Sequence, residues 1–171
     1  MRNKGTKNQW FLFCMGLIMV TISMAILGYY GIRKVNREIQ KQKLLREHVV
    51  VEISDLNIKA PVLEGTDQNT LSKAAGHFRQ TGAVGSGNYC IAGHSSTIYQ
   101  EYFNNLKDAE IGMEIHLYDL EKQCFTYRIT EKFIINPNEL WVLDDFDDNR
   151  ITIITCTDDG TQRQVVVGTR S

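Results

Sequence analysis

Two short segments place reactive side chains at positions where a strand is expected to end. Cys156 follows the β-branched run ITIIT (151–155), and His94 follows the apolar run YCIAG (89–93). A cysteine becomes a nucleophile when a nearby imidazolium or guanidinium favours its thiolate form. The simpler interpretation of a lone cysteine is a small buried hydrophobic side chain. The shared position at a strand end favours a Cys156–His94 pair.

Arg163 begins a second β-branched run, RQVVVG (163–168), after the short connection TDDGTQ (157–162). In an antiparallel hairpin, the residue that begins the second strand lies near the residue that ends the first. A guanidinium at this position could stabilise a thiolate or donate hydrogen bonds to an oxyanion. The alternative is a surface arginine paired with Asp158 or Asp159, which contributes little energy.

The other histidines have weaker positions. His48 lies in a polar segment, and His77 follows a glycine that is expected to end a helix, which indicates a structural role. His116 alternates with polar residues on a predicted strand, as a surface histidine does. His94 therefore remains the candidate base.

No cofactor is predicted, and calcium is the one metal considered. Four acidic residues of the connection 136–150 could supply oxygen ligands: Asp144, Asp145, Asp147 and Asp148. They lack the spacing and the glycine of an EF-hand, and a solvated acidic loop is the favoured interpretation. The net charge of -1 argues against nucleic-acid binding.

The N-terminal part of the chain predicts a membrane anchor. Residues 10–30 contain no charge, and as a helix they would extend about 31 Å, close to the hydrocarbon thickness of a bilayer. Trp10 and Tyr30 suit the two interfaces. The run is longer than the apolar core of a cleaved signal peptide, so an uncleaved anchor is favoured. Basic residues flank both ends and leave the orientation open.

Four segments are predicted: a short basic segment (1–9), a transmembrane anchor (10–32), a polar basic tether (33–48) and a β-rich domain (49–171). In the last segment we expect strands at 49–53, 58–63, 89–93, 113–120, 124–135, 151–155 and 163–168, and short helices at 67–75 and 97–106. Seven or eight strands with two short helices predict a mainly β fold that closes, or nearly closes, into a barrel. Three cysteines fall in this domain, and a disulfide between Cys90 and Cys124 stays open.

Three motifs together resemble the sortases, the membrane-anchored cysteine transpeptidases of Gram-positive bacteria. They are PVLEGT (61–66), GNYCIAGH (87–94) and TIITCTDDGTQR (152–163), and the similarity extends from about Val51 to Gly168. The N-terminal anchor and TCTD look most like class A, with classes D and E close. The resemblance implies an eight-stranded β-barrel with the active site in a groove at one end of the strands.

The resemblance also implies roles for individual residues. Cys156 would attack the Thr–Gly carbonyl of an LPxTG-type sorting signal, and His94 would be the general acid and base. Arg163 would stabilise the oxyanion or orient the substrate. Four further residues match substrate-binding positions: Ala92, Val142, Leu143 and Ile154.

The partners implied are surface-protein sorting signals and an acceptor amine, either from a lipid II-type cell-wall precursor or from a pilin lysine. The implied location is the cell membrane, with a cytoplasmic N-terminus and the catalytic domain outside. The alternatives are a pilin polymerase, a hydrolase, or a membrane-tethered β-barrel that only binds peptide.

Overall fold

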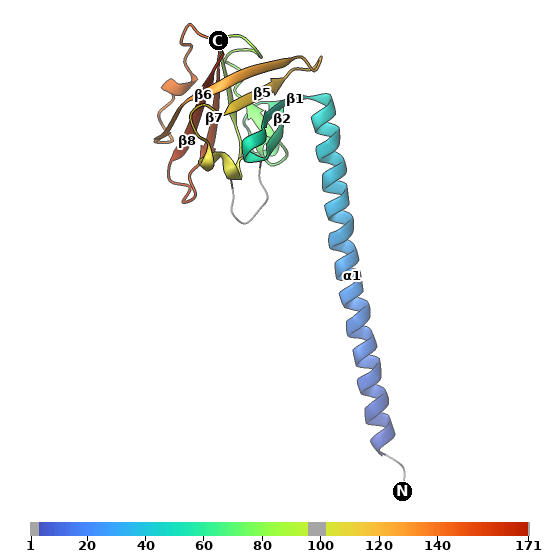
Figure 1. The fold of residues 1–171 in the computed structure, drawn as a ribbon. Helices are drawn as coiled ribbons and strands as arrows, with labels where there is room; N and C mark the ends of the chain where they lie inside the picture. Colours follow the sequence, from blue (N-terminus) through green and yellow to red (C-terminus); the bar gives the residue numbers. More distant parts are fainter. Residues whose placement is uncertain (1–3, 96–101, 171) are drawn as a thin grey trace. The chain divides into compact units, whose positions relative to one another are not determined.

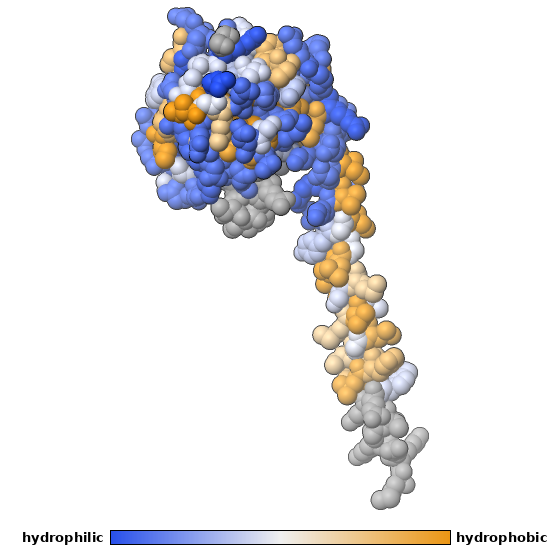
Figure 2. Space-filling model, viewed as in Figure 1, coloured by the Kyte–Doolittle hydropathy of each residue, from blue (hydrophilic) through white to orange (hydrophobic). Residues whose placement is uncertain are grey.

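The computed structural model describes residues 4–95 and 102–170, and the chain divides into two compact units, 1–42 and 43–171. One helix, α1, runs from Lys4 to Glu47 and includes both the predicted anchor and the predicted tether. Figure 2 shows apolar side chains along the visible face of its described part. Among the described residues it is the one helix long and apolar enough to cross a membrane, a property that signal sequences share.

The second unit is a closed barrel of eight strands (Figure 1). The strands are β1 (Val49–Ile53), β2 (Ile58–Glu64), β3 (Ala75–His77), β4 (Asn88–Ala92), β5 (Glu114–Tyr118), β6 (Cys124–Ile135), β7 (Arg150–Cys156) and β8 (Arg163–Thr169). Their order around the barrel is β1-β2-β3-β4-β7-β8-β6-β5, and β5 pairs with β1 to close it. The pairs β2–β3 and β4–β7 are parallel, and the remaining pairs are antiparallel.

The short helices lie in the connections between strands. α2 (Gln68–Leu71) precedes β3, and three 3₁₀ turns are present: η1 (Ser54–Leu56), η2 (Asn104–Asp108) and η3 (Trp141–Leu143). The first half of the predicted helix at 97–106 lies outside the described residues, and its described half, 102–106, contains a turn and the start of η2 in place of an α-helix.

The predicted eight-stranded barrel is confirmed, but one predicted element is wrong. The helix expected at 67–75 begins as predicted, because the Asp67 carboxylate accepts hydrogen bonds from the Asn69 and Thr70 amides. It ends at Leu71, and Ala75–His77 form the short strand β3 instead. Only a glycine fits at position 76, since a Cβ there would lie 2.3 Å from the Gly65 carbonyl oxygen. The small residues that looked like a helix end therefore allow close pairing with β2.

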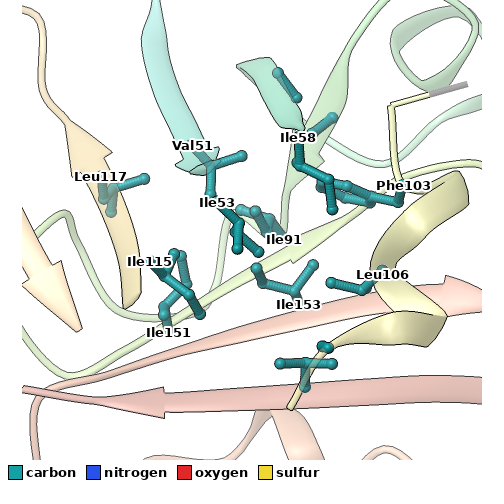
Figure 3. Close-up of a cluster of buried hydrophobic side chains, with 14 of the residues drawn as sticks. Val51, Ile53, Ile58, Ile91, Phe103, Leu106, Ile115, Leu117, Ile151 and Ile153 are labelled. Carbon is teal, nitrogen blue, oxygen red and sulfur yellow. The ribbon is translucent and has the colours of Figure 1, made fainter. Parts of the chain in front are cut away.

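The interior of the barrel is filled by alternate residues of the strands. Ile151 and Ile153 of β7 lie inside, packed with Ile91 of β4 and with apolar residues of β1 and β5 (Figure 3). Each such side chain contributes about 1.5–3 kcal/mol when it is fully buried. This core holds β4 and β7 rigidly side by side.

A second apolar cluster lies on the outer face of β7 and β8. Alternation turns Ile154, Val165 and Val167 outward, where they pack with Ile135 and with Val142 of η3. Because β7 and β8 are covered on both faces, their sequences are continuous β-branched runs and do not alternate with polar residues. Several residues of this outer cluster line the candidate site described below.

Candidate active site

Strand register brings the three predicted catalytic residues to neighbouring strand ends. β4 and β7 are parallel with Ala92 beside Ile154, and the Gly93 amide continues this ladder by donating to the Ile154 carbonyl at 3.1 Å. His94 and Cys156 are each two residues further on, so both lie at the same end of these neighbouring strands. In the antiparallel β7–β8 pair, Cys156 is directly opposite Arg163.

Hydrogen bonds tie the His94 loop to the cysteine strand. The Thr155 hydroxyl donates to the Gly93 carbonyl at 2.9 Å, and the Ser95 hydroxyl donates to the Cys156 carbonyl at 3.1 Å. Thr155 is buried, and alternation along β7 turns the Cys156 side chain to the other face of the strand, which is the face of Ile154. The backbone around His94 and Cys156 is therefore fixed from both strands.

All seven predicted site residues line one groove of about 330 Å³. They are Ala92, His94, Val142, Leu143, Ile154, Cys156 and Arg163. Ile154 and Val142 belong to the outer apolar cluster, so one end of the groove is apolar. The half-buried Cys156, His94 and Arg163 supply the polar end. This arrangement suits an extended peptide with apolar side chains beside a reacting carbonyl.

Arg163 has no carboxylate partner among residues 4–95 and 102–170, so the alternative of a surface ion pair is wrong. Its Nη1 donates to the Gln162 carbonyl at 3.0 Å and to the Gly160 carbonyl at 3.4 Å. Asp158 instead pairs with Lys107 at 3.0 Å. The guanidinium is thus held by the backbone of its own loop. No described carboxylate pairs with it, so it is available to bind an anion in the groove.

The loop between Cys156 and Arg163 is organised by Asp159. Its carboxylate accepts hydrogen bonds from the hydroxyls of Thr157 and Thr161 and from the Thr161 amide. These bonds, the Thr157 hydroxyl first, lower the pKa of Asp159 to about 2. Their stabilising contribution is complete above the ordinary pKa and is lost only as the pH falls through about 2. The Asp159 carboxylate is therefore ionised at neutral pH, the form that accepts these three hydrogen bonds.

The acidic connection does not form a metal site in the described part of the chain. Asp148 pairs with the Arg150 guanidinium at 2.6 Å, and Asp145 accepts a hydrogen bond from the Asp147 amide. Among residues 4–95 and 102–170, no group of three or more His, Cys, Asp or Glu side chains is placed to hold a metal ion. No step of the chemistry below uses calcium.

The remaining cysteines differ from Cys156 in environment. Cys90 is buried on β4, and burial raises the pKa of its thiol to about 12. Cys124 is exposed on β6. Both are free thiols, so the structure contains no Cys90–Cys124 disulfide.

The other β-domain histidines have partners outside the groove. His77 is buried on β3, where its ring lies 3.0 Å from both a Glu64 carboxylate oxygen and the Gly82 carbonyl and stacks on Tyr89. These contacts fit the structural role expected of it. His116 is on β5, beside Thr126 and Cys124 of β6.

Several groove residues were not predicted. Thr66, Leu71 and Phe78 form the far wall, and Leu140 extends the wall that contains Val142 and Leu143. The apolar residues among them, Leu71, Phe78 and Leu140, each stand in a polar stretch of sequence, which was a usable signal. Asn88, a buried amide behind the groove, was also missed, because one polar residue at the start of an apolar strand reads as a strand boundary.

Residues 51–171 match the sortase domain family, and the chain therefore belongs to the sortase family. It is 28% identical over 135 residues to sortase A of Bacillus anthracis, covering 77% of this chain and 64% of that protein, so it spans less than two thirds of that relative's length.

Solved structures show the same fold. The structure of sortase A from Listeria monocytogenes aligns with a TM-score of 0.68 at 30% identity, covering 74% of this chain and 88% of that one. A Sortase D5 transpeptidase from Clostridium perfringens aligns with a TM-score of 0.65 at 32% identity, covering 78% and 88%. The predicted likeness to classes A and D is thus confirmed.

Proposed function

We propose that this protein is a membrane-anchored cysteine transpeptidase that cleaves LPxTG-like sorting signals between Thr and Gly and transfers the Thr carbonyl to an amino group. One observation carries the proposal: Cys156, His94 and Arg163, from three neighbouring strands, line one end of a single groove whose other end is apolar. Family membership supports the same chemistry.

In the first half-reaction, the Cys156 thiolate attacks the Thr carbonyl carbon and the carbonyl oxygen becomes an oxyanion. Arg163 lies opposite Cys156 and stabilises this charge. The C–N bond to glycine then breaks, and the His94 imidazolium gives its proton to the departing amine. The products are a thioester on Cys156, neutral His94 and a free glycine amine.

In the second half-reaction, an incoming amine attacks the thioester carbon while neutral His94 takes its proton. The C–S bond breaks, which restores the thiolate and the imidazolium. A thiolate suits both steps because it is a strong nucleophile and a good leaving group. In the groove, Ala92 and Ile154 contact the signal beside the reacting bond, and Val142 and Leu143 contact its leucine and proline.

We propose a class A-like role in which the acceptor is a lipid II-type cell-wall precursor. A free amine that ends a wall precursor is reachable from a domain tethered just outside the membrane. The α1 helix is proposed as the anchor, with the N-terminus in the cytoplasm. Transfer to a pilin lysine or to water are the alternatives, and they differ only in the second nucleophile.

The test is to incubate the full-length protein in detergent with an LPxTG peptide and to measure intact mass. We expect the mass to rise by that of the peptide acyl fragment, and Cys156→Ala to show no adduct. Separate reactions with an oligoglycine amine, a pilin lysine peptide and buffer alone identify the acceptor. An adduct that persists in Cys156→Ala, or no adduct in the wild type, would overturn the proposal.

A further inference from the structure

Asn88, at the start of β4, is a buried polar side chain that the chemistry above does not use. It is 2% exposed, and its hydrogen bonds link three segments of the barrel. Its side-chain amide donates to the Val142 carbonyl at 2.9 Å and to the Asp144 carbonyl at 2.8 Å. Its oxygen accepts a hydrogen bond from the Thr152 hydroxyl at 2.7 Å.

This network allows only one orientation of the amide. Both carbonyl oxygens are acceptors, so the NH₂ group must face them, and the Asn88 oxygen then faces the Thr152 hydroxyl. Val142 and Asp144 lie in and just after the last turn of η3, where carbonyls have no partner within the helix. Asn88 therefore caps η3 from a strand more than fifty positions away in sequence.

The capped turn carries one wall of the groove. Val142 and Leu143 line the groove. Asn88 donates hydrogen bonds to the carbonyl of Val142 itself and to the carbonyl of Asp144, the residue that follows Leu143. Asn88 is on the same face of β4 as Ala92, and the strand leads directly to His94. One strand thus positions both the base and the wall that contacts the substrate.

We propose that Asn88 is a positioning residue that sets the specificity of the groove by fixing η3 against β4. The inference rests on the proposed function and adds to it how recognition is coupled to the catalytic strand. Without Asn88, the carbonyls of Val142 and Asp144 lose the amide donor that they share. Only a weak contact from the Cys90 thiol to the Val142 carbonyl, at 3.8 Å, remains, and η3 moves to find water. The wall then fits the apolar part of the sorting signal poorly, while Cys156, His94 and Arg163 keep their places.

The experiment compares Asn88→Ala with the wild type in the full-length protein. We expect the KM for an LPxTG peptide to rise about tenfold with kcat within about twofold, because wall contacts are shared by ground and transition states. Preference for the correct peptide over one with alanine in place of the leucine should fall by about the same factor.

Asn105→Ala is the matched control. The Asn105 amide donates to the Leu56 carbonyl of η1 at 2.9 Å, so it too holds a 3₁₀ turn, but neither residue lines the groove. We expect its KM to equal that of the wild type. An equal rise in KM for both variants would mean that general destabilisation is the cause, and the proposal would be wrong.

Hydrogen exchange of the free protein tests the η3 attachment without any substrate. The Leu143 and Asp144 amides donate to Leu140 and Trp141 within η3, and we expect them to exchange at least about tenfold faster in Asn88→Ala and unchanged in Asn105→Ala. If Asn88→Ala does not fold, Thr152→Val, which removes only the hydroxyl that orients Asn88, should show a smaller increase confined to the same turn. Unchanged exchange overturns the proposal. If the wild-type protein forms no peptide adduct, the proposed function is wrong, and so is the specificity role of Asn88. The hydrogen-exchange result would still show whether Asn88 holds η3 in place.

Discussion

Two places in the described part of the barrel each contain a cysteine, a histidine and an arginine. One is the groove with Cys156, His94 and Arg163. The other is the outer face of β5 and β6, where the Cys124 sulfur lies 3.8 Å from Nδ1 of His116 and Arg128 is nearby on β6. By residue type the two places are alike, so the differences between them show what makes a site.

The surroundings differ in three ways. Cys124 is exposed on an open strand face, whereas Cys156 is half-buried at a strand end. Arg128 is paired with Glu114 at 3.2 Å, whereas Arg163 has no carboxylate partner in the described residues. The groove also has an apolar end, formed in part by Ile154 and Val142. Under the proposed function, the chemistry therefore depends on the strand ends, the free guanidinium and the apolar walls.

Replacing each of the two cysteines by alanine should give the largest difference in activity between the two places. We expect Cys156→Ala to abolish thioester formation, because no other group can form the acyl bond. Cys124→Ala should keep kcat/KM within about twofold. Intact mass after reaction with an LPxTG peptide measures both. An adduct on Cys124 in the Cys156→Ala variant would show that the exposed pair is reactive and would reverse the comparison.

Replacing the two histidines should show the same difference between the groove and the face of β5 and β6, with a smaller loss of activity. His94→Ala removes the proton donor and acceptor, and we expect a loss of about 10²- to 10⁴-fold in kcat. His116→Ala should change kcat little, since the ring faces Thr126 and Cys124 away from the groove. Steady-state rates with peptide and amine acceptor measure this. Equal losses in the two variants would indicate a general effect on folding, which thermal unfolding would reveal.

Part of this division was predictable from sequence. The position of Arg163 opposite Cys156 follows from hairpin geometry, because the connection is short and antiparallel pairing is local. The position of His94 beside Cys156 does not follow from local geometry, because β4 and β7 are parallel strands about sixty residues apart. The shared strand-end position favoured the pair, and the resemblance to a family strengthened it. The strand β3 was missed because a run of three residues, Ala75–His77, is too short to show a period.

The wall of the groove shows the limit of prediction most clearly. Val142 and Leu143 were placed only by resemblance, and what holds them is a hydrogen-bond network through Asn88 and Thr152. Such networks depend on the packing of distant segments, which local propensity does not encode. The apolar runs predicted the barrel because burial acts through alternation within each strand.

Substitutions of Arg163 and Arg128 compare the activity lost with a guanidinium in the groove and with one that is paired to a carboxylate. We expect Arg163→Ala to lower kcat by about 10²- to 10³-fold, the usual effect of losing an oxyanion donor. Arg163→Lys should recover only part of this, because an ammonium does not reproduce the planar pair of donors. Arg128→Ala breaks an exposed ion pair and should leave the rate within about twofold. A lysine variant with full activity would mean that charge alone is needed at this position.

The smallest expected effect lies in the loop that supports Arg163, and it compares two adjacent carboxylates. Asp159→Ala removes the acceptor of three hydrogen bonds that order the loop, and we expect kcat/KM to fall about threefold to tenfold through a less fixed Arg163. Asp158→Ala removes only an exposed pair with Lys107 and should change kcat/KM by less than about twofold.

The pH dependence identifies the cause of that loss. Because the pKa of Asp159 is lowered to about 2, its carboxylate is ionised throughout the range from about pH 5 to about pH 9. The ratio of wild-type to Asp159→Ala activity should therefore be constant over this range. If the ratio declines toward pH 5, the Asp159 carboxylate is being protonated there. The hydrogen bonds that lower its pKa would then not be formed in solution. Arg163 would then be positioned by the strand register without help from Asp159, and the loop would not distinguish the two sites.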